Sequence, residues 1–337
     1  MHFIFRIPEL TTRGSAAAGF ALLCAFICIA LSGVTGNAIA AQASLTEQSI
    51  LIAYQNTQGF SQQLLENIQQ SISKAGYKTH LKILNTDALK TLKTEKHSLI
   101  IAIGSKTTKQ LLHEKIETPI FSVLMPRHLA RKLRKLYPDK NNWSSLVLDQ
   151  PIRRQLELIT SITDPHQKVG ALTGPYTMDL KKTLEQSAKA AEHTLITESV
   201  NNVDQLTASL KTLSRKSDIL LTLPDPVIYN KRTIRGILLL SYRKKLPIVG
   251  FSQAYVKAGA IAAIYSEPYQ ISKQASGIIL NFLKNRRFSL KEYQADDFSV
   301  ALNRKVARSL GINLPEKAEI IRKIKNAEKN SRNGTNQ

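Results

Sequence analysis

The sequence predicts an α/β protein made of two lobes, each a doubly wound parallel sheet, joined by a hinge with a cleft between them. Apolar runs of strand length alternate with amphipathic stretches of helix length along most of the chain. Several of these runs are apolar at every position, as in strands covered by helices on both faces. The alternation falls into two blocks of similar length and plan. Each block therefore predicts one lobe, with a ligand bound where the carboxyl ends of the strands meet.

In the first block, the predicted strands carry short apolar runs and the helix between the first two ends at a glycine. The strands are 49–54, 77–83, 99–103 and 119–124, and the helices are 59–75 and 106–113. The second block repeats this order. Its strands are 146–148, 168–172, 194–200, 218–223, 247–251, 259–265 and 298–302, and its helices are 152–162, 180–191, 203–213, 230–242, 271–283 and 305–310. The polar and basic tail, 316–337, is predicted to be disordered after Ala327.

The N-terminal forty residues have the pattern of a secretory signal. Arg6 and Arg13 make the start weakly basic, and the apolar run 16–34 follows. Two small-x-small cleavage sites come next and end at Ala40 and Ala43. A retained membrane anchor is the alternative, because the run nearly has the length needed to cross a bilayer. The helix-weakening stretch 32–36 favours cleavage. We therefore predict release into the periplasm of a Gram-negative bacterium.

The cysteines and the charge narrow the function further. Cys24 and Cys28 both lie in the predicted signal, so the mature chain, of about 295 residues, has no disulfide and no thiolate chemistry. The net charge of the whole chain is +22. For an exported protein this charge does not indicate nucleic acid. It is compatible with an anionic lipid surface, an acidic partner or an anionic ligand, or with a solvated basic surface that has no specific target.

One segment concentrates this charge. Residues 127–140 carry six basic side chains beside a stripe formed by Leu129, Leu133 and Leu136, which predicts an amphipathic basic helix. Weak contact with an anionic membrane surface and a solvated outer face are the two interpretations of this helix.

The candidate binding residues follow predicted strands. Gly104, Ser105 and Thr107 open a helix, where backbone N–H groups and the helix dipole favour an anionic group such as a carboxylate. The alternative is a plain turn with Ser105 as the N-cap. Asp225 follows another strand, and it either pairs with an amino group of the ligand or caps the next helix. The remaining candidates in such loops are Tyr54, Gln55, Asn56, Tyr176 and Tyr229.

Ser252 is a candidate nucleophile, because 250–254 has the form G-x-S-x-A that follows a strand in α/β-hydrolases. That fold needs a histidine after the serine, and all seven histidines precede Ser252. Phe251 and Ser252 are therefore interpreted as cleft residues and not as catalytic ones. The histidines show no metal-binding spacing, so neither a metal nor another cofactor is expected.

Four stretches in order resemble the substrate-binding proteins of ABC transporters with a type I periplasmic-binding fold, including members that bind tryptophan or tyrosine. They are the strand–helix unit ending at 75–77, the turn at 102–107 with 118–120, the segment 221–225 with 246–251, and the segment 255–260 with 302–303 and 310–315. The sequence departs from the family pattern at 125–127 and at 144–146, near the hinge and the cleft.

The resemblance implies three crossings between the lobes. Lobe one is then 46–145 plus 247–288, lobe two is 146–246 plus 289–315, and 316–337 is the tail. It also implies a periplasmic, monomeric solute-binding protein and no enzyme. Such a protein captures a small molecule, an amino acid or other small carboxylate, and delivers it to an ABC permease. The alternative is a ligand-binding sensory or adaptor protein of the cell envelope with no dedicated transporter.

Overall fold

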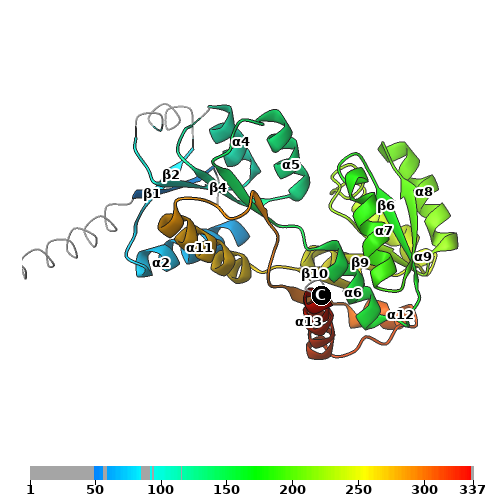
Figure 1. The fold of residues 1–337 in the computed structure, drawn as a ribbon. Helices are drawn as coiled ribbons and strands as arrows, with labels where there is room; N and C mark the ends of the chain where they lie inside the picture. The colour runs from blue at the N-terminus through cyan, green and yellow to red at the C-terminus, as the bar shows by residue number, and fades with distance from the viewer. Residues whose placement is uncertain (1–48, 56–58, 85–91, 93–94, 115, 335–337) are drawn as a thin grey trace, which may run out of the picture. The chain divides into compact units, whose positions relative to one another are not determined.

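The computed structural model describes residues 49–334 except for 56–58, 85–91, 93–94 and 115, and it divides the chain after Gln48, so the predicted signal lies outside the described residues. Residues 49–334 form two six-stranded sheets with helices between the strands (Figure 1). None of the helices in the described part of the chain is long and apolar enough to cross a membrane. The predicted fold class, two doubly wound α/β lobes, is confirmed.

The first sheet has the order β11-β5-β4-β3-β1-β2, and all its pairings are parallel. Its strands are β1 (Ser49–Tyr54), β2 (Lys78–Ile83), β3 (Leu99–Ile103), β4 (Ile120–Met125), β5 (Trp143–Val147) and β11 (Glu292–Tyr293). Helices α2 (Phe60–Lys74) and α11 (Pro268–Asn285) pack together on one face, and α4 (Ser105–His113) and α5 (Arg127–Leu136) cover the other. Alternate β1 residues enter the two cores, Ile50 one and Leu51 the other, which explains the continuous apolar run.

The second sheet has the order β12-β10-β9-β8-β6-β7. Its strands are β6 (Lys168–Thr173), β7 (Thr194–Ser199), β8 (Ile219–Leu221), β9 (Ile248–Gly250), β10 (Ala262–Tyr265) and β12 (Ser299–Leu302), the last antiparallel to β10. On one face of this sheet the core is formed with α6 (Ile152–Ile162), α7 (Lys181–Ala190), α12 (Arg304–Ser309) and α13 (Lys317–Gly334). On the other face the core is formed with α8 (Val203–Lys216), α9 (Ile234–Arg243) and α10 (Gln253–Ala258). A short 3-10 helix, η1 (Met178–Leu180), precedes α7.

The chain passes between the sheets three times: after β5, after β10 and after β11. The predicted division of the lobes is wrong at two places. Strands β9 and β10 lie in 247–288 but pair with β8 and with each other in the second sheet. Of that range, α11 alone packs against the first sheet. Similarly, β11 belongs to the first sheet although 289–315 was assigned to the second lobe.

The C-terminal tail also differs from the prediction. Instead of becoming disordered after Ala327, the chain forms α13, which extends to Gly334 and packs on α6. Ile320 and Ile324 are fully buried in the core of the second lobe. They lie four residues apart and so share one face of the helix. This short apolar stripe was too sparse in a basic segment to be recognised from sequence.

The predicted basic helix exists as α5, and its arginines contact the protein itself. Arg127 Nε donates to Glu292 Oε1 at 2.9 Å, and Arg131 pairs with Asp179. The Arg134 guanidinium lies 4.4 Å from the centre of the Trp143 ring and donates to Ser145 Oγ at 3.0 Å. Membrane contact through this helix stays a prediction. Among the described residues, no ion pair or hydrogen bond joins the side chains of Lys132 and Lys135 to a partner.

A cleft at the ends of both sheets

The largest described hollow is a cleft of about 900 Å³ at the carboxyl ends of strands from both sheets. Its lining comes from the carboxyl ends of five strands and from two helices. These residues are Leu124 and Pro126 at the end of β4, 148–150 after β5, Pro224 after β8, 251–254 after β9, 265–268 at the end of β10, Gly59, Ser61 and Gln63 at the start of α2, and Gln155 in α6. Parallel strands end in loops at the same edge of a sheet. This edge is therefore where α/β folds place their ligands.

Apolar and amide side chains dominate the wall of the cleft. The apolar part comes from Leu124, Leu148, Phe251, Tyr265 and three prolines, and the amides from Gln63, Gln150, Gln155 and Gln253. Asp149 and Glu267 are the charged residues among the described lining, which includes no lysine, arginine or histidine. This composition contrasts with the +22 charge of the whole chain.

Two predicted binding residues, Phe251 and Ser252, line the cleft. Ser252 is the N-cap of α10, where its side chain makes no capping hydrogen bond. Phe251 lies 4.6 Å from Tyr255, ring centre to ring centre, and 6.2 Å from Tyr229. Both residues directly follow β9, as the reasoning from strand ends expected. Their role in binding stays a proposal.

The other predicted residues lie elsewhere, and Asn56 is outside the described residues. Tyr54 ends β1 and packs against the core of the first lobe, while Gln55 hydrogen-bonds to Gln110. None of Tyr54, Gln55, Gly104, Ser105, Thr107, Tyr176, Asp225 and Tyr229 is among the described residues that line the cleft.

The turn at Gly104 is built differently from the predicted cap. Gly104 itself is the N-cap of α4, with φ of 88°, and Ser105 is the first helical residue. A positive φ favours glycine, which explains the residue at this position. Thr107 is buried, and Thr108, which the sequence reasoning missed, donates to Ser122 Oγ at 2.9 Å. An anion at this turn remains a prediction from the sequence.

Asp225 is fully buried and has three partners within the protein. It accepts hydrogen bonds from Tyr176 N at 2.9 Å, Val227 N at 3.0 Å and Thr177 Oγ1 at 3.1 Å. A Cβ on Gly174 would lie 2.6 Å from the same carboxylate, so glycine is needed there for the close approach. These contacts join the loop after β6 to the loop after β8. The next helix, α9, begins only at Ile234, so Asp225 stabilises a turn at 226–228 and does not cap the predicted helix.

Tyr229 is also enclosed by the protein. Its side chain packs against Phe251 and Tyr255, and its hydroxyl has no hydrogen-bond partner among the described residues. Burial raises the pKa of the Tyr229 hydroxyl strongly, so the group stays neutral. An aromatic cluster of Tyr229, Phe251 and Tyr255 thus supports the cleft wall from behind.

Asp149, Gln155 and Glu267 are cleft residues that the sequence reasoning missed. Asp149 follows β5, and its carboxylate accepts a hydrogen bond from Arg127 N at 2.7 Å; burial raises the pKa of the carboxyl group. Glu267 follows β10 and caps α11 with its side chain. Their positions just after strands were a usable signal. Gln155 lies within a helix and gave none.

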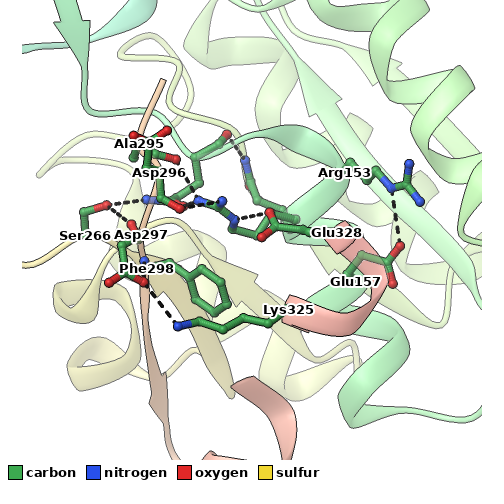
Figure 2. A network of polar contacts seen from close by, with 12 residues as sticks. Arg153, Glu157, Ser266, Ala295, Asp296, Asp297, Phe298, Lys325 and Glu328 are labelled. Carbon is green, nitrogen blue, oxygen red and sulfur yellow. Dashed lines mark hydrogen bonds and ion pairs between the residues drawn. The ribbon is translucent and has the colours of Figure 1, made fainter. Parts of the chain in front are cut away.

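The three crossings are tied together beside the cleft (Figure 2). Gln150, from the first crossing, donates to Ser266 Oγ of the second at 2.6 Å, and that hydroxyl donates to the Asp297 carbonyl of the third at 2.8 Å. Arg154 donates to Gln150 Oε1, to the carbonyls of Ala295 and Asp296, and to Glu328 Oε1 of α13. These bonds fix the chain where a hinge between the lobes has to lie.

Comparisons with known proteins agree with this architecture. Residues 53–323 match the family model described as ABC transporter substrate binding protein. The chain belongs to this family. A substrate-binding protein of this kind binds a solute for an ABC transporter, and the family is one of solute-binding proteins rather than enzymes. No curated protein matches the chain.

Solved structures share the fold of this substrate-binding protein at low sequence identity. A conserved domain protein from Vibrio cholerae is 20% identical, with a TM-score of 0.56 over 81% of this chain and 97% of that one. A domain in complex with L-Trp from Streptococcus pneumonia is 18% identical, with a TM-score of 0.56 over 80% and 96%. The ligand-free, open structure of a substrate binding protein with adhesive properties from Clostridium difficile is 15% identical, with a TM-score of 0.64 over 81% and 97%.

Proposed function

We propose that the mature protein is a periplasmic solute-binding protein that captures an amino acid or other small carboxylate in the cleft and delivers it to an ABC permease. The observation that carries the proposal is the 900 Å³ cleft at the strand ends of both sheets in a member of this family. Its size suits a small organic ligand. Export by a signal cleaved after Ala40 or Ala43 would bring the protein to its solute.

In the proposed mechanism Phe251 and Leu148 contact the apolar part of the ligand, and the amides and Ser252 orient its polar groups. Binding would favour a closed arrangement of the lobes by the differential contacts that both sheets offer. The closed form is what a permease would recognise. No metal or cofactor is needed for capture, and the described residues hold no cluster of three potential metal ligands.

The test is a thermal-shift screen of purified mature protein, freed of bound ligand by unfolding and refolding, against amino acids, aromatic compounds and small carboxylates. A ligand present at a hundred times its Kd should stabilise the folded state by about 2.7 kcal/mol. Phe251→Ala should weaken binding of a hit, whereas Phe288→Ala, in the other lobe's core, should change stability without changing affinity. The proposal fails if no compound in a broad panel raises the Tm.

A further inference from the structure

The lining of the cleft distinguishes between the charged groups that a ligand can carry. Both charged side chains on its described wall are acidic, Asp149 and Glu267. The N-terminal ends of α2, α5, α10 and α11 also begin at this wall, at Gly59, Pro126, Ser252 and Glu267. Asp149 accepts the N–H of Arg127 at the start of α5, and Glu267 caps α11, so helix dipoles offset part of the negative charge. Among its side chains, the described wall therefore offers charged partners to a cation and none to a carboxylate.

Gln155 provides an independent observation. Its side chain lines the cleft although the residue is only 3% exposed. Gln155 Nε2 donates to the Gln150 carbonyl at 3.1 Å, which fixes the orientation of the amide. The remaining polar atom of the amide is the oxygen Oε1, and it has no hydrogen-bond partner among the described residues. A buried acceptor without a partner is costly, so this oxygen is a vacant place for a donor.

A basic residue beside this wall, Arg127, is already paired. Arg127 donates its backbone N–H to Asp149, but its guanidinium bonds to Glu292 Oε1 at 2.9 Å. It is therefore not available to neutralise both acids or to hold a carboxylate in the cleft. Burial raises the pKa of the Asp149 carboxyl group, and a cation beside it would favour the ionised form.

We propose that the cleft recognises a primary ammonium group, held by Gln155 Oε1 and the carboxylates of Asp149 and Glu267, and that its ligand needs no carboxylate. The ligand class is thus an amine with an apolar body, which Leu124, Leu148 and Phe251 contact. This inference rests on the proposed solute-binding function. It narrows that function, because a carboxylate without an amino group is excluded as the preferred ligand.

The experiment compares ligands that differ by one group. Phenylalanine, phenethylamine and 3-phenylpropionate share one body, and norleucine, pentylamine and hexanoate share another. Affinities for the mature protein are measured by calorimetry and thermal shift. In at least one series, we expect the amine to bind as well as the amino acid, and the carboxylate to bind at least tenfold more weakly. The inference is overturned if the amine does not bind while the carboxylate or the amino acid does.

The variant Asp149→Asn/Glu267→Gln removes both charges and keeps acceptor atoms of the same shape. It should weaken amine binding by about 10- to 100-fold, the range expected for lost charged hydrogen bonds. The control Glu185→Gln/Asp204→Asn removes two exposed acids on α7 and α8 and gives the same net charge. It should leave amine affinity unchanged. Equal effects of the two double variants would contradict recognition within the cleft.

Gln155→Met tests the acceptor by itself. It should weaken amines about tenfold and leave 3-phenylpropionate unaffected. Circular dichroism and the Tm confirm that each variant is folded. The failures remain distinguishable: if carboxylates bind and amines do not, the solute-binding function stands and the inference falls. If neither these six compounds nor any member of the broad panel binds, both fall.

Discussion

Arg154 and Glu328 are joined by a hydrogen bond of 2.5 Å between Nε and Oε1, across 174 positions of the sequence. The Arg154 side chain is 2% exposed and also lies 4.8 Å from the Phe298 ring. Through it the C-terminal helix α13 is connected to the first and third crossings. A helix at the end of the chain thereby supports the segments on which any hinge motion depends.

Glu328→Gln should lower the free energy of unfolding by about 1–3 kcal/mol, because a buried guanidinium loses its charged acceptor. Urea denaturation of the mature protein measures the change. Glu319→Gln on the same helix is the matched control, since its pair with Lys323 is exposed on both sides. The control should change stability by less than about 0.5 kcal/mol. Similar losses of unfolding free energy for the two variants would show that the Arg154–Glu328 contact stabilises the protein no more than an exposed ion pair.

Asp225→Ala should destabilise the fold by about 3 kcal/mol, because it leaves three donors, one buried and two part-buried, without their acceptor. Asp225→Asn should have a smaller effect, since the amide oxygen still accepts from Tyr176 N or Val227 N. Chemical denaturation gives both values. Asp204→Ala, at an exposed site, is the control. A folded Asp225→Asn variant of normal stability that binds no ligand would instead make Asp225 a ligand contact.

Tyr229→Phe should leave stability unchanged or raise it by up to about 1 kcal/mol, because the hydroxyl that it removes is buried without a partner. Tyr229→Ala should cost about 3–5 kcal/mol through loss of the packing against Phe251 and Tyr255. Thermal and urea unfolding compare the two. If Tyr229→Phe keeps its stability but binds a confirmed ligand tenfold more weakly, the hydroxyl belongs to the binding site after all.

The stability of the second lobe should depend on the protonation of His193. Its Nδ1 accepts a hydrogen bond from Gln167 N at 3.2 Å. Burial lowers the pKa of this imidazole, with a smaller contribution from His166. The unfolded state then binds the proton more readily, so stability is present at neutral pH and falls as the pH drops through about 6.5, the unperturbed value, toward the folded pKa.

Urea midpoints measured between about pH 7.5 and 5.5 test this dependence. His193→Gln, which keeps an acceptor for Gln167 N, should reduce the slope of stability against pH. His113→Gln, at an exposed site on α4, should leave the slope as it is. An unchanged slope in His193→Gln would exclude this histidine as its source.

The sequence predicted most of the strands and helices because continuous apolar runs and helical spacing are local signals. The order of the blocks placed β9 and β10 with the second lobe, as the structure does, whereas the lobe boundaries that the resemblance implied misassigned them. The sequence pattern also missed α13. Of the described residues of that helix, only Ile320 and Ile324 are fully buried, and two apolar positions are a weak signal.

Position after a strand led to Phe251 and Ser252, which line the cleft, and to Asp225, which does not. The carboxylate of Asp225 is used by neighbouring N–H groups, which a pattern of residues does not reveal. Gln155 was invisible because its neighbours in α6 belong to an ordinary amphipathic helix. Its importance depends on the Gln150 carbonyl, which turns the amide so that one oxygen is left without a donor.

The short strand β11 extends the first sheet at Glu292 and Tyr293, and six residues later the chain enters the second sheet as β12. Neither sheet can therefore be completed before the chain has been synthesised almost to its end. Such long-range pairings delay folding and couple the two halves kinetically. The two lobes should refold in one cooperative step and should not survive separately as fragments. Under the proposed export, a chain that crosses the membrane unfolded would benefit from this delay, because it would stay competent for transport until its last segment is available.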